Sequence, residues 1–194
     1  MKLSDFNILF ITEKFTDGNS SQPLSNTYHN LFGSFKRSFP DIKFNVVHYD
    51  ELFLTHKKHI NNIIENVYQK YKPNIIFCSL LLNSDLNPSV EALKVLKDKG
   101  CYICFFWPDI QQAFGIKELK QYDEAVNLHV SHAGERNLEN NDKIMWLWTP
   151  QDPKLYYPGN NNYKTIPVSF IGSVRYTDRQ QHLQYAIDQK VPLF

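Results

Sequence analysis

Cysteine and net charge are both scarce in this sequence, and each scarcity excludes a class of protein. The 194 residues include three cysteines, too few for the disulfide framework of a small secreted domain. The formal net charge is +1, which gives no general attraction to nucleic acid or to an anionic membrane. No apolar run reaches the roughly 18 residues that cross a bilayer, so we expect no integral membrane segment. The N-terminus, Met1–Asp5, has no signal-peptide architecture, and we expect a cytoplasmic protein.

The common catalytic and cofactor fingerprints are also missing. The sequence has no GxGxxG, no GxxxxGK[ST], no HExxH, no GxSxG and no DxD triplet. His56 and His59 are spaced by three on a predicted helix, but no acidic or cysteine partner nearby completes a metal set. Cys101 and Cys104 have CxxC spacing inside an apolar run, which indicates an inert core pair; a redox or zinc site is the alternative. We expect neither a metal nor a tightly bound cofactor.

What the sequence does contain is a regular alternation of apolar runs and amphipathic segments. Hydrophobic residues make up 42% of the chain, as in ordinary globular proteins. Near-continuous apolar runs separated by helical patterns predict βαβ units, and therefore an α/β fold with a Rossmann-like parallel sheet and helices on both faces. The six predicted strands are Phe6–Thr12, Lys43–His48, Asn74–Ser79, Cys101–Phe106, Ala125–Val130 and Lys143–Trp148.

The helical patterns between these runs predict four further elements. Apolar residues from Leu24 to Phe39 recur at helical spacing, and Pro23 is suited to the first turn. One long amphipathic helix is predicted from Leu52 to Tyr71. Another starts at Asn87-Pro88 and stops at Gly100, and a helix or turn occupies 110–120. Trp146 and Trp148 alternate in the last strand, which predicts that both face the core.

After Trp148 the composition changes to loop-forming stretches rich in proline, glycine and asparagine. We interpret residues 1–158 as an N-terminal Rossmann-like domain and 159–165 as a linker. Residues 166–194 resemble the first strand and helix of a second Rossmann-like domain, which cannot form a core alone. We therefore interpret the chain as a piece of a longer protein; the alternative is that this tail packs back on the first domain.

Candidate site residues lie in the loops that follow the strands, where open parallel sheets bind ligands. The loop Thr12–Gln22 is long and polar, with Asp17, Gly18 and Asn19 at its middle, and an ordinary connection is the alternative. Trp107-Pro108-Asp109 places a carboxylate beside a large aromatic ring, which suits sugar hydroxyls or proton abstraction; a turn or helix cap is the alternative.

Two later loops offer weaker candidates. His132 follows the fifth strand and is a candidate base or phosphate contact, although a structural role in a short helix is the competing interpretation. Gly172, Ser173 and Arg175 lie between a predicted strand and a helix, where backbone amides and a guanidinium can hold a diphosphate. Gly-Ser turns are common, so this signal is weak when taken alone.

Several short motifs together resemble the CgeB-like glycosyltransferases, a group related to spore-coat maturation proteins. The resembling segments are Phe105–Asp109, Tyr122–Val126 with Val130-Ser131, Leu147–Pro153 with Tyr157-Pro158, and Pro167–Ser173 with Arg175 and Arg179. They span most of the chain from about the fourth strand onward. Pro108 departs from the family pattern, in which another acidic or small residue often stands.

The resemblance implies a GT-B architecture, with two Rossmann-like domains facing each other across a cleft. Asp17, Gly18, Asn19, Trp107 and His132 would then lie on the acceptor side, with Asp109 as the catalytic candidate. Gly172, Ser173 and Arg175 would lie near the donor diphosphate. The implied partners are a nucleotide-sugar donor and an unknown acceptor.

Our leading hypothesis is therefore a glycosyltransferase that moves a sugar from a nucleoside diphosphate donor to that acceptor. On this interpretation most of the donor domain is missing from the chain, and the chain alone should not turn over. The main alternative is a non-catalytic Rossmann-like binding or scaffold module. A flavodoxin-like or receiver-type domain is a third reading, which needs a phosphate loop or an acidic cluster after the first strand.

Overall fold

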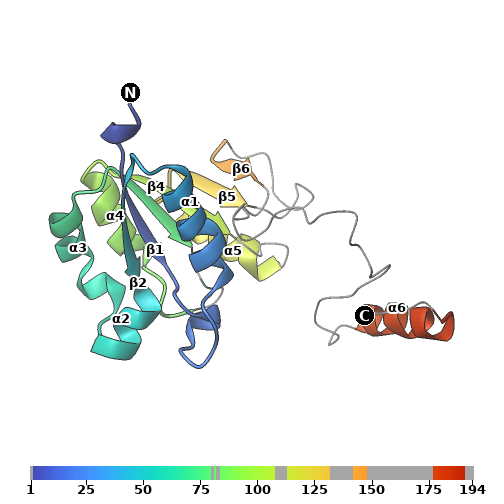
Figure 1. The fold of residues 1–194 in the computed structure, drawn as a ribbon. Helices are drawn as coiled ribbons and strands as arrows, with labels where there is room; N and C mark the ends of the chain where they lie inside the picture. The colour runs from blue at the N-terminus through green and yellow to red at the C-terminus, as the bar shows by residue number, and fades with distance from the viewer. Residues whose placement is uncertain are drawn as a thin grey trace. The chain divides into compact units, whose positions relative to one another are not determined.

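The computed structural model describes residues 2–79, 81, 84–107, 113–131, 142–147 and 177–190 (Figure 1). The chain divides into two compact units, Met1–Tyr156 and Tyr157–Phe194. In the second unit the described part is helix α6 (Thr177–Asp188), where the sequence pattern predicted a helix. The predicted linker 159–165 and strand 166–171 lie outside the described residues, so the proposed domain boundaries stay predictions.

The first unit contains a six-stranded sheet in which all neighbouring strands run parallel. This confirms the predicted Rossmann-like α/β class, and each strand overlaps one of the predicted apolar runs, although β5 begins three residues later than predicted. The central strands are apolar on both faces because helices cover both; Leu9, Phe10 and Ile11 have no exposed surface. The strands are β1 (Asn7–Thr12), β2 (Lys43–His48), β3 (Ile75–Ser79), β4 (Tyr102–Trp107), β5 (Leu128–Ser131) and β6 (Ile144–Trp146).

The strand order is β2-β1-β3-β4-β5-β6. The chain passes from β1 outward to β2 and then crosses back over β1 to β3, so the direction of winding reverses between β1 and β3. Over its first five strands this is the flavodoxin-type order of doubly wound sheets. Ligands of such sheets bind where the order reverses, beyond the carboxyl ends of the strands, so β1 and β3 locate the place to examine.

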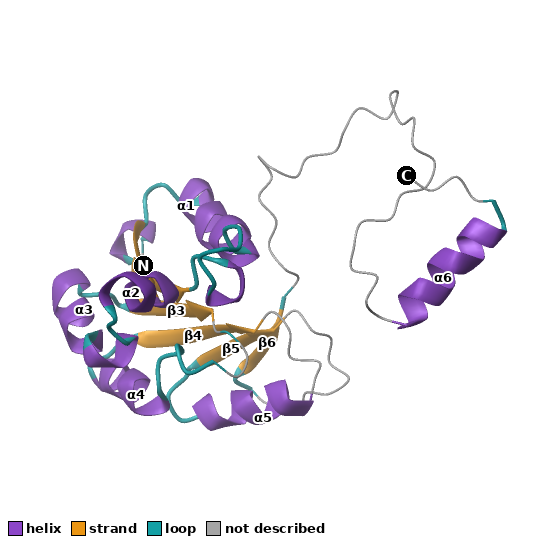
Figure 2. Ribbon diagram, turned by 90° about the horizontal axis from the view of Figure 1, so that it is seen from below, coloured by secondary structure: helices purple, strands orange, loops and turns teal. Residues whose placement is uncertain are grey.

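Helices cover the two faces of the sheet unequally (Figure 2). The larger apolar cluster lies under α2, α3, α4 and α5, and the smaller one lies under η3 and α1. In the smaller cluster Phe10 contacts the rings of Phe32 and Phe35 at centroid distances of 5.4 and 5.8 Å. The described helical elements are η1 (Leu3–Asp5), η2 (Thr16–Gly18), the π-helix η3 (Thr27–Gly33), α1 (Ser34–Ser38), α2 (Tyr49–His56), η4 (Ile60–Asn62), α3 (Ile64–Tyr71), α4 (Val90–Asp98) and α5 (Ala113–Tyr122).

The prediction of one long helix from Leu52 to Tyr71 is wrong, because the structure has three elements there, α2, η4 and α3. Lys57 ends α2 in the left-handed conformation, with φ 51°. His59 then caps η4 by accepting a hydrogen bond from the Asn61 amide. Apolar residues on either side of the break still face the same core, which is why the periodicity in the sequence did not reveal it.

Two further expectations are corrected. Pro23 precedes the helix instead of occupying its first turn, because its carbonyl accepts a hydrogen bond from Thr16 and the Ser25 hydroxyl accepts one from the Tyr28 amide. Trp146 is 42% exposed on the edge strand β6, so it does not face the core as its alternation predicted. The expected stop at Gly100 is confirmed, with φ +87°, a conformation that favours glycine. Within the described residues, no helix has the length and apolarity needed to cross a bilayer.

The left-handed Lys57 provides a test of the helix break. Lys57→Gly should stabilise the protein by about 0.5–1 kcal/mol, because glycine adopts positive φ without the steric cost that lysine bears. Chemical denaturation measures the change. The matched control, Lys117→Gly inside α5, should instead destabilise by about 1 kcal/mol. If both variants lose stability equally, the break at Lys57 is not left-handed.

Candidate functional site

The loop after β1 crosses the carboxyl end of the sheet at the point where the strand order reverses. It runs from Glu13 to the start of η3 and is held at both ends. An antiparallel bridge joins Phe15 to Leu24, and the Ser25 amide donates to the Lys14 carbonyl at 2.9 Å. The loop is therefore a closed structure lying beside the ends of β1 and β3, as expected for a binding loop of an open α/β sheet.

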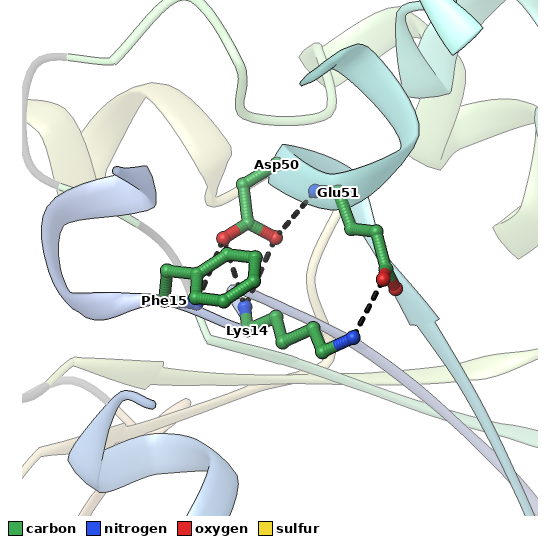
Figure 3. Close-up of polar contacts among 4 residues, drawn as sticks. All are labelled: Lys14, Phe15, Asp50 and Glu51. Carbon is green, nitrogen blue, oxygen red and sulfur yellow. Dashed lines mark hydrogen bonds and ion pairs between the residues drawn. The ribbon is translucent and has the colours of Figure 1, made fainter. Parts of the chain in front are cut away.

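Asp50, in the first turn of α2, anchors this loop (Figure 3). Its carboxylate is fully buried and accepts backbone hydrogen bonds from Lys14 and Phe15 at 2.9 Å and from Glu51 at 2.8 Å. The Lys14 ammonium pairs with Glu51 at 2.5 Å, nearer the surface. Three amides directed at one buried carboxylate position the first residues of the loop against the N-terminus of α2.

Glu13, directly after β1, has a strongly shifted pKa. Burial raises its pKa from the ordinary 4.5 to about 7; a hydrogen bond from Ser25 opposes the rise, and the charges of Asp50 and Asp17 add to it. Its Oε2 atom is buried without a hydrogen-bond partner. A carboxyl that titrates near neutrality at a strand end is suited to accept a proton from a bound hydroxyl.

A row of buried and half-buried polar side chains crosses the ends of the first three strands. Thr12 pairs in register with His48, and Ser79 is the next position along β3 from the partner of Ile11. The Ser79 hydroxyl contacts that of Thr27 at 3.4 Å, and the His48 ring lies 5.5 Å from the Tyr28 ring. The row therefore lies under the π-helix η3, and the apolar sheet face becomes polar at its carboxyl end.

The loop residues predicted as cleft-facing are placed as follows. Asp17 and Asn19 are exposed, and Asn19 Oδ1 accepts hydrogen bonds from the amide and hydroxyl of Ser21, so it stabilises the loop. Gly18 is buried with φ +65°, and a Cβ there would lie 3.1 Å from a methyl carbon of Leu81. Gly18 thus lets the loop pack against the segment after β3, and Asp17 acts on Glu13 through its charge.

Trp107 lies at the end of β4 but is 1% exposed. Its indole N–H donates to His129 Nδ1 at 3.0 Å, and His129 Nε2 lies 2.9 Å from Asp123 Oδ1. Burial lowers the pKa of His129, so the neutral ring accepts from Trp107 and donates to Asp123. Trp107 can contact a ligand directly only if its ring leaves this network.

The remaining predicted site residues lie outside the described residues. These are Asp109, His132, Gly172, Ser173 and Arg175. Their proposed roles, catalytic for Asp109 and phosphate-binding for the last three, stay predictions.

The three cysteines are free and buried, in agreement with their interpretation as core residues. Burial raises the pKa of Cys104 to about 11 and also raises that of Cys78, so neither thiol is an activated nucleophile near neutral pH. The described residues contain no group of three histidine, cysteine or acidic side chains that could hold a metal ion.

Sequence reasoning did not single out the residues that dominate this site. Glu13 was part of the polar loop, and its position directly after a buried strand was the available signal. Asp50 looked like an ordinary acidic residue at a helix start. His48 carried no local signal beyond its position at a strand end, because its burial comes from Tyr28 on η3.

Comparisons with known proteins found similarity to solved structures but no family. No family model matches the chain, and no curated protein matches it. Among solved structures, the chain is similar to a two-component response regulator of the LuxR family from Aurantimonas sp. SI85-9A1, with 12% identity and a TM-score of 0.38. The match covers 66% of this chain and 75% of that one. A similarity at this level carries no information on activity.

The Asp50 anchor predicts a large difference between two neighbouring substitutions. Asp50→Ala should lower the free energy of unfolding by about 2–4 kcal/mol, because it leaves backbone amides without their buried acceptor. Glu51→Ala removes a partly exposed ion pair and should cost less than about 1 kcal/mol. Urea denaturation of the two variants measures both. Equal losses would contradict the anchoring role of Asp50.

The raised pKa of Glu13 predicts a particular dependence of stability on pH. Between about 4.5 and 7 the folded protein holds a proton that the unfolded chain releases, so the Glu13 contribution to stability falls as pH rises through this window. Glu13→Gln should remove that fall. The difference in free energy of unfolding, variant minus wild type, should be about 1–3 kcal/mol larger at pH 8 than at pH 4.5, a range that allows for the partial exposure of Glu13. Denaturation curves at both pH values measure it. A difference between the two proteins that does not change with pH would refute the shift.

Proposed function

We propose that this protein is a glycosyltransferase in which the first unit holds the acceptor and Glu13 is the base that activates it. The donor is a nucleoside-diphosphate sugar, as the resemblance to the CgeB-like group implies. The observation that carries the proposal is a buried carboxyl with a pKa near 7 and an unpartnered oxygen, at the point where the strand order reverses.

The proposed chemistry requires little more than a positioned base. The Glu13 carboxylate takes the proton of an acceptor hydroxyl, whose oxygen bonds to the anomeric carbon of the donor sugar. The bond from that carbon to the diphosphate oxygen breaks, and the nucleoside diphosphate leaves with the electron pair. A base with a pKa near the working pH is half ionised there and still strong enough to accept the proton.

Three features of the described residues support Glu13 in this role. Asp50 holds the backbone of Lys14, the residue after Glu13, so a fixed neighbour sets the position of the Glu13 carboxyl. The Ser25 hydroxyl bonds to the Glu13 side chain and orients it. Lys14, the nearest cation along the chain, is paired with Glu51 and so does not neutralise Glu13. Asp109 stays a second candidate base from the sequence alone.

The proposal is tested by transfer and donor hydrolysis assays on the full-length protein with UDP- and GDP-sugars. Glu13→Gln should lower the rate about 100- to 10,000-fold while donor binding is kept. The wild-type rate should rise with pH to a plateau, with an apparent pKa near 7 that is absent from the variant. Glu91→Gln, at the exposed start of α4, is the matched control and should leave the rate unchanged.

Two results would count against the proposal. If no common donor is hydrolysed, transferred or bound, the chain is not a glycosyltransferase. If transfer occurs but Glu13→Gln retains it, the base lies elsewhere. A gain in stability from Glu13→Gln without any activity in wild type would favour the alternative, a non-catalytic binding module.

A further inference from the structure

A cavity lies at the edge of the sheet, in a part of the molecule that the proposed site does not use. Its volume is about 410 Å³, within the range of roughly 300–1,000 Å³ that small-molecule sites occupy. Its walls come from α2, α3 and the edge strand β2 (Figure 1). Because the chain turns at Lys57 and does not continue as one helix, α2 and α3 form separate walls. No residue of the loop Thr12–Gln22 lines the cavity.

One part of the lining is apolar and belongs to the main core. Val47, Leu52, Ile63 and Tyr71 are half-buried, and Val67 is buried. Val67 is a member of the larger apolar cluster, and the other four side chains pack against it. The core therefore fixes the shape of this wall, which offers apolar surface from one strand and two helices to a molecule in the cavity.

The rest of the lining is cationic or neutral. It consists of His56, Lys58, Asn66 and Lys70, and no acidic residue of the described chain lines the cavity. Neither lysine forms an ion pair with another described residue. The Lys70 ammonium lies 4.9 Å from the centre of the Tyr71 ring, so it is held beside the apolar wall. The cavity thus combines apolar surface with positive charge that no neighbouring carboxylate balances.

The general stabilisation of helices explains only part of this charge. His56 and Lys70 lie in the last turns of α2 and α3, where cations interact favourably with the terminal carbonyls. Lys58 lies between α2 and η4, where that explanation does not apply. A small inorganic anion would leave the apolar wall unused, and a neutral hydrocarbon would leave both lysines unpaired. The lining is matched by a molecule that has an apolar body and a single anionic head.

We infer that this cavity binds a small amphipathic anion, a carboxylate on an alkyl or aryl body. The body lies against Val47, Ile63 and Val67, and the carboxylate is held by Lys58 and Lys70. The inference goes beyond the proposed function and does not depend on it, because the cavity shares no residue with the site around Glu13.

The inference is tested by NMR titration of the full chain with hexanoate and octanoate. Acetate, 1-octanol and octylammonium are the comparisons, which remove the apolar body, the charge, or the sign of the charge. Octanoate should bind about tenfold more tightly than hexanoate, because each buried methylene strengthens binding roughly fourfold. Acetate should not bind detectably, and 1-octanol and octylammonium should bind more weakly than octanoate.

Two further measurements locate the site. The double variant Lys58→Gln with Lys70→Gln should weaken octanoate binding about tenfold and leave 1-octanol binding unchanged. Both lysines are exposed, so the variant should fold, and Lys117→Gln on α5 is the matched control. In wild type the ring resonances of Tyr71 should shift as octanoate is added, whereas those of Tyr102, 46% exposed on β4, should not.

Several results would overturn the inference. These are failure of both longer carboxylates to bind, equal binding of octanoate, 1-octanol and octylammonium, an affinity for octanoate that the double variant keeps, or Tyr71 resonances that do not move. Because the titration contains no sugar donor, none of these results bears on the glycosyltransferase proposal. Loss of transfer activity in Glu13→Gln likewise leaves this inference untouched.

Discussion

The buried Asp50 carboxylate is the interaction on which the rest of the site depends. It accepts hydrogen bonds from the amides of Lys14, Phe15 and Glu51, and so joins the chain leaving β1 to the start of α2. The loop begins at a defined place because buried backbone amides need a hydrogen-bond partner, and the Asp50 carboxylate is the partner of these. Glu13, directly before the anchored segment, is consequently held in a partly buried position instead of turning out to solvent.

That position explains the chemistry of the site. Burial makes the ionised form of Glu13 costly, and its pKa rises to about 7. One side-chain atom of Asn30, within the π-helix η3, and one of His48, at the end of β2, are also buried without a hydrogen-bond partner. Stability is thus lower at this end of the sheet than close packing and full pairing would give. Such losses of stability are common at sites where a ligand supplies the missing hydrogen-bond partners.

The contrast with the opposite end of the sheet is informative. There the Asn7 side chain donates to the carbonyls of Tyr71 and Lys72 at the end of α3. The backbone N–H of Asn7 donates to Asn74 Oδ1. Polar side chains at that end satisfy backbone groups and one another. At the carboxyl end, polar groups are gathered without being fully satisfied. The asymmetry agrees with the general rule that open α/β sheets bind ligands beyond the carboxyl ends of their strands.

The sequence by itself determined the type and order of the elements. The strand Lys43–His48 was predicted with its observed bounds, and the six apolar runs became six parallel strands, because burial on both faces leaves a local pattern that can be read directly. The break at Lys57 was missed because both halves of the helix face one core. Only the tertiary structure decided the strand order, the burial of Trp107 and the position of Asp50 against the loop that follows β1. These depend on which distant strands pair and which helix covers them, and no local periodicity records that choice.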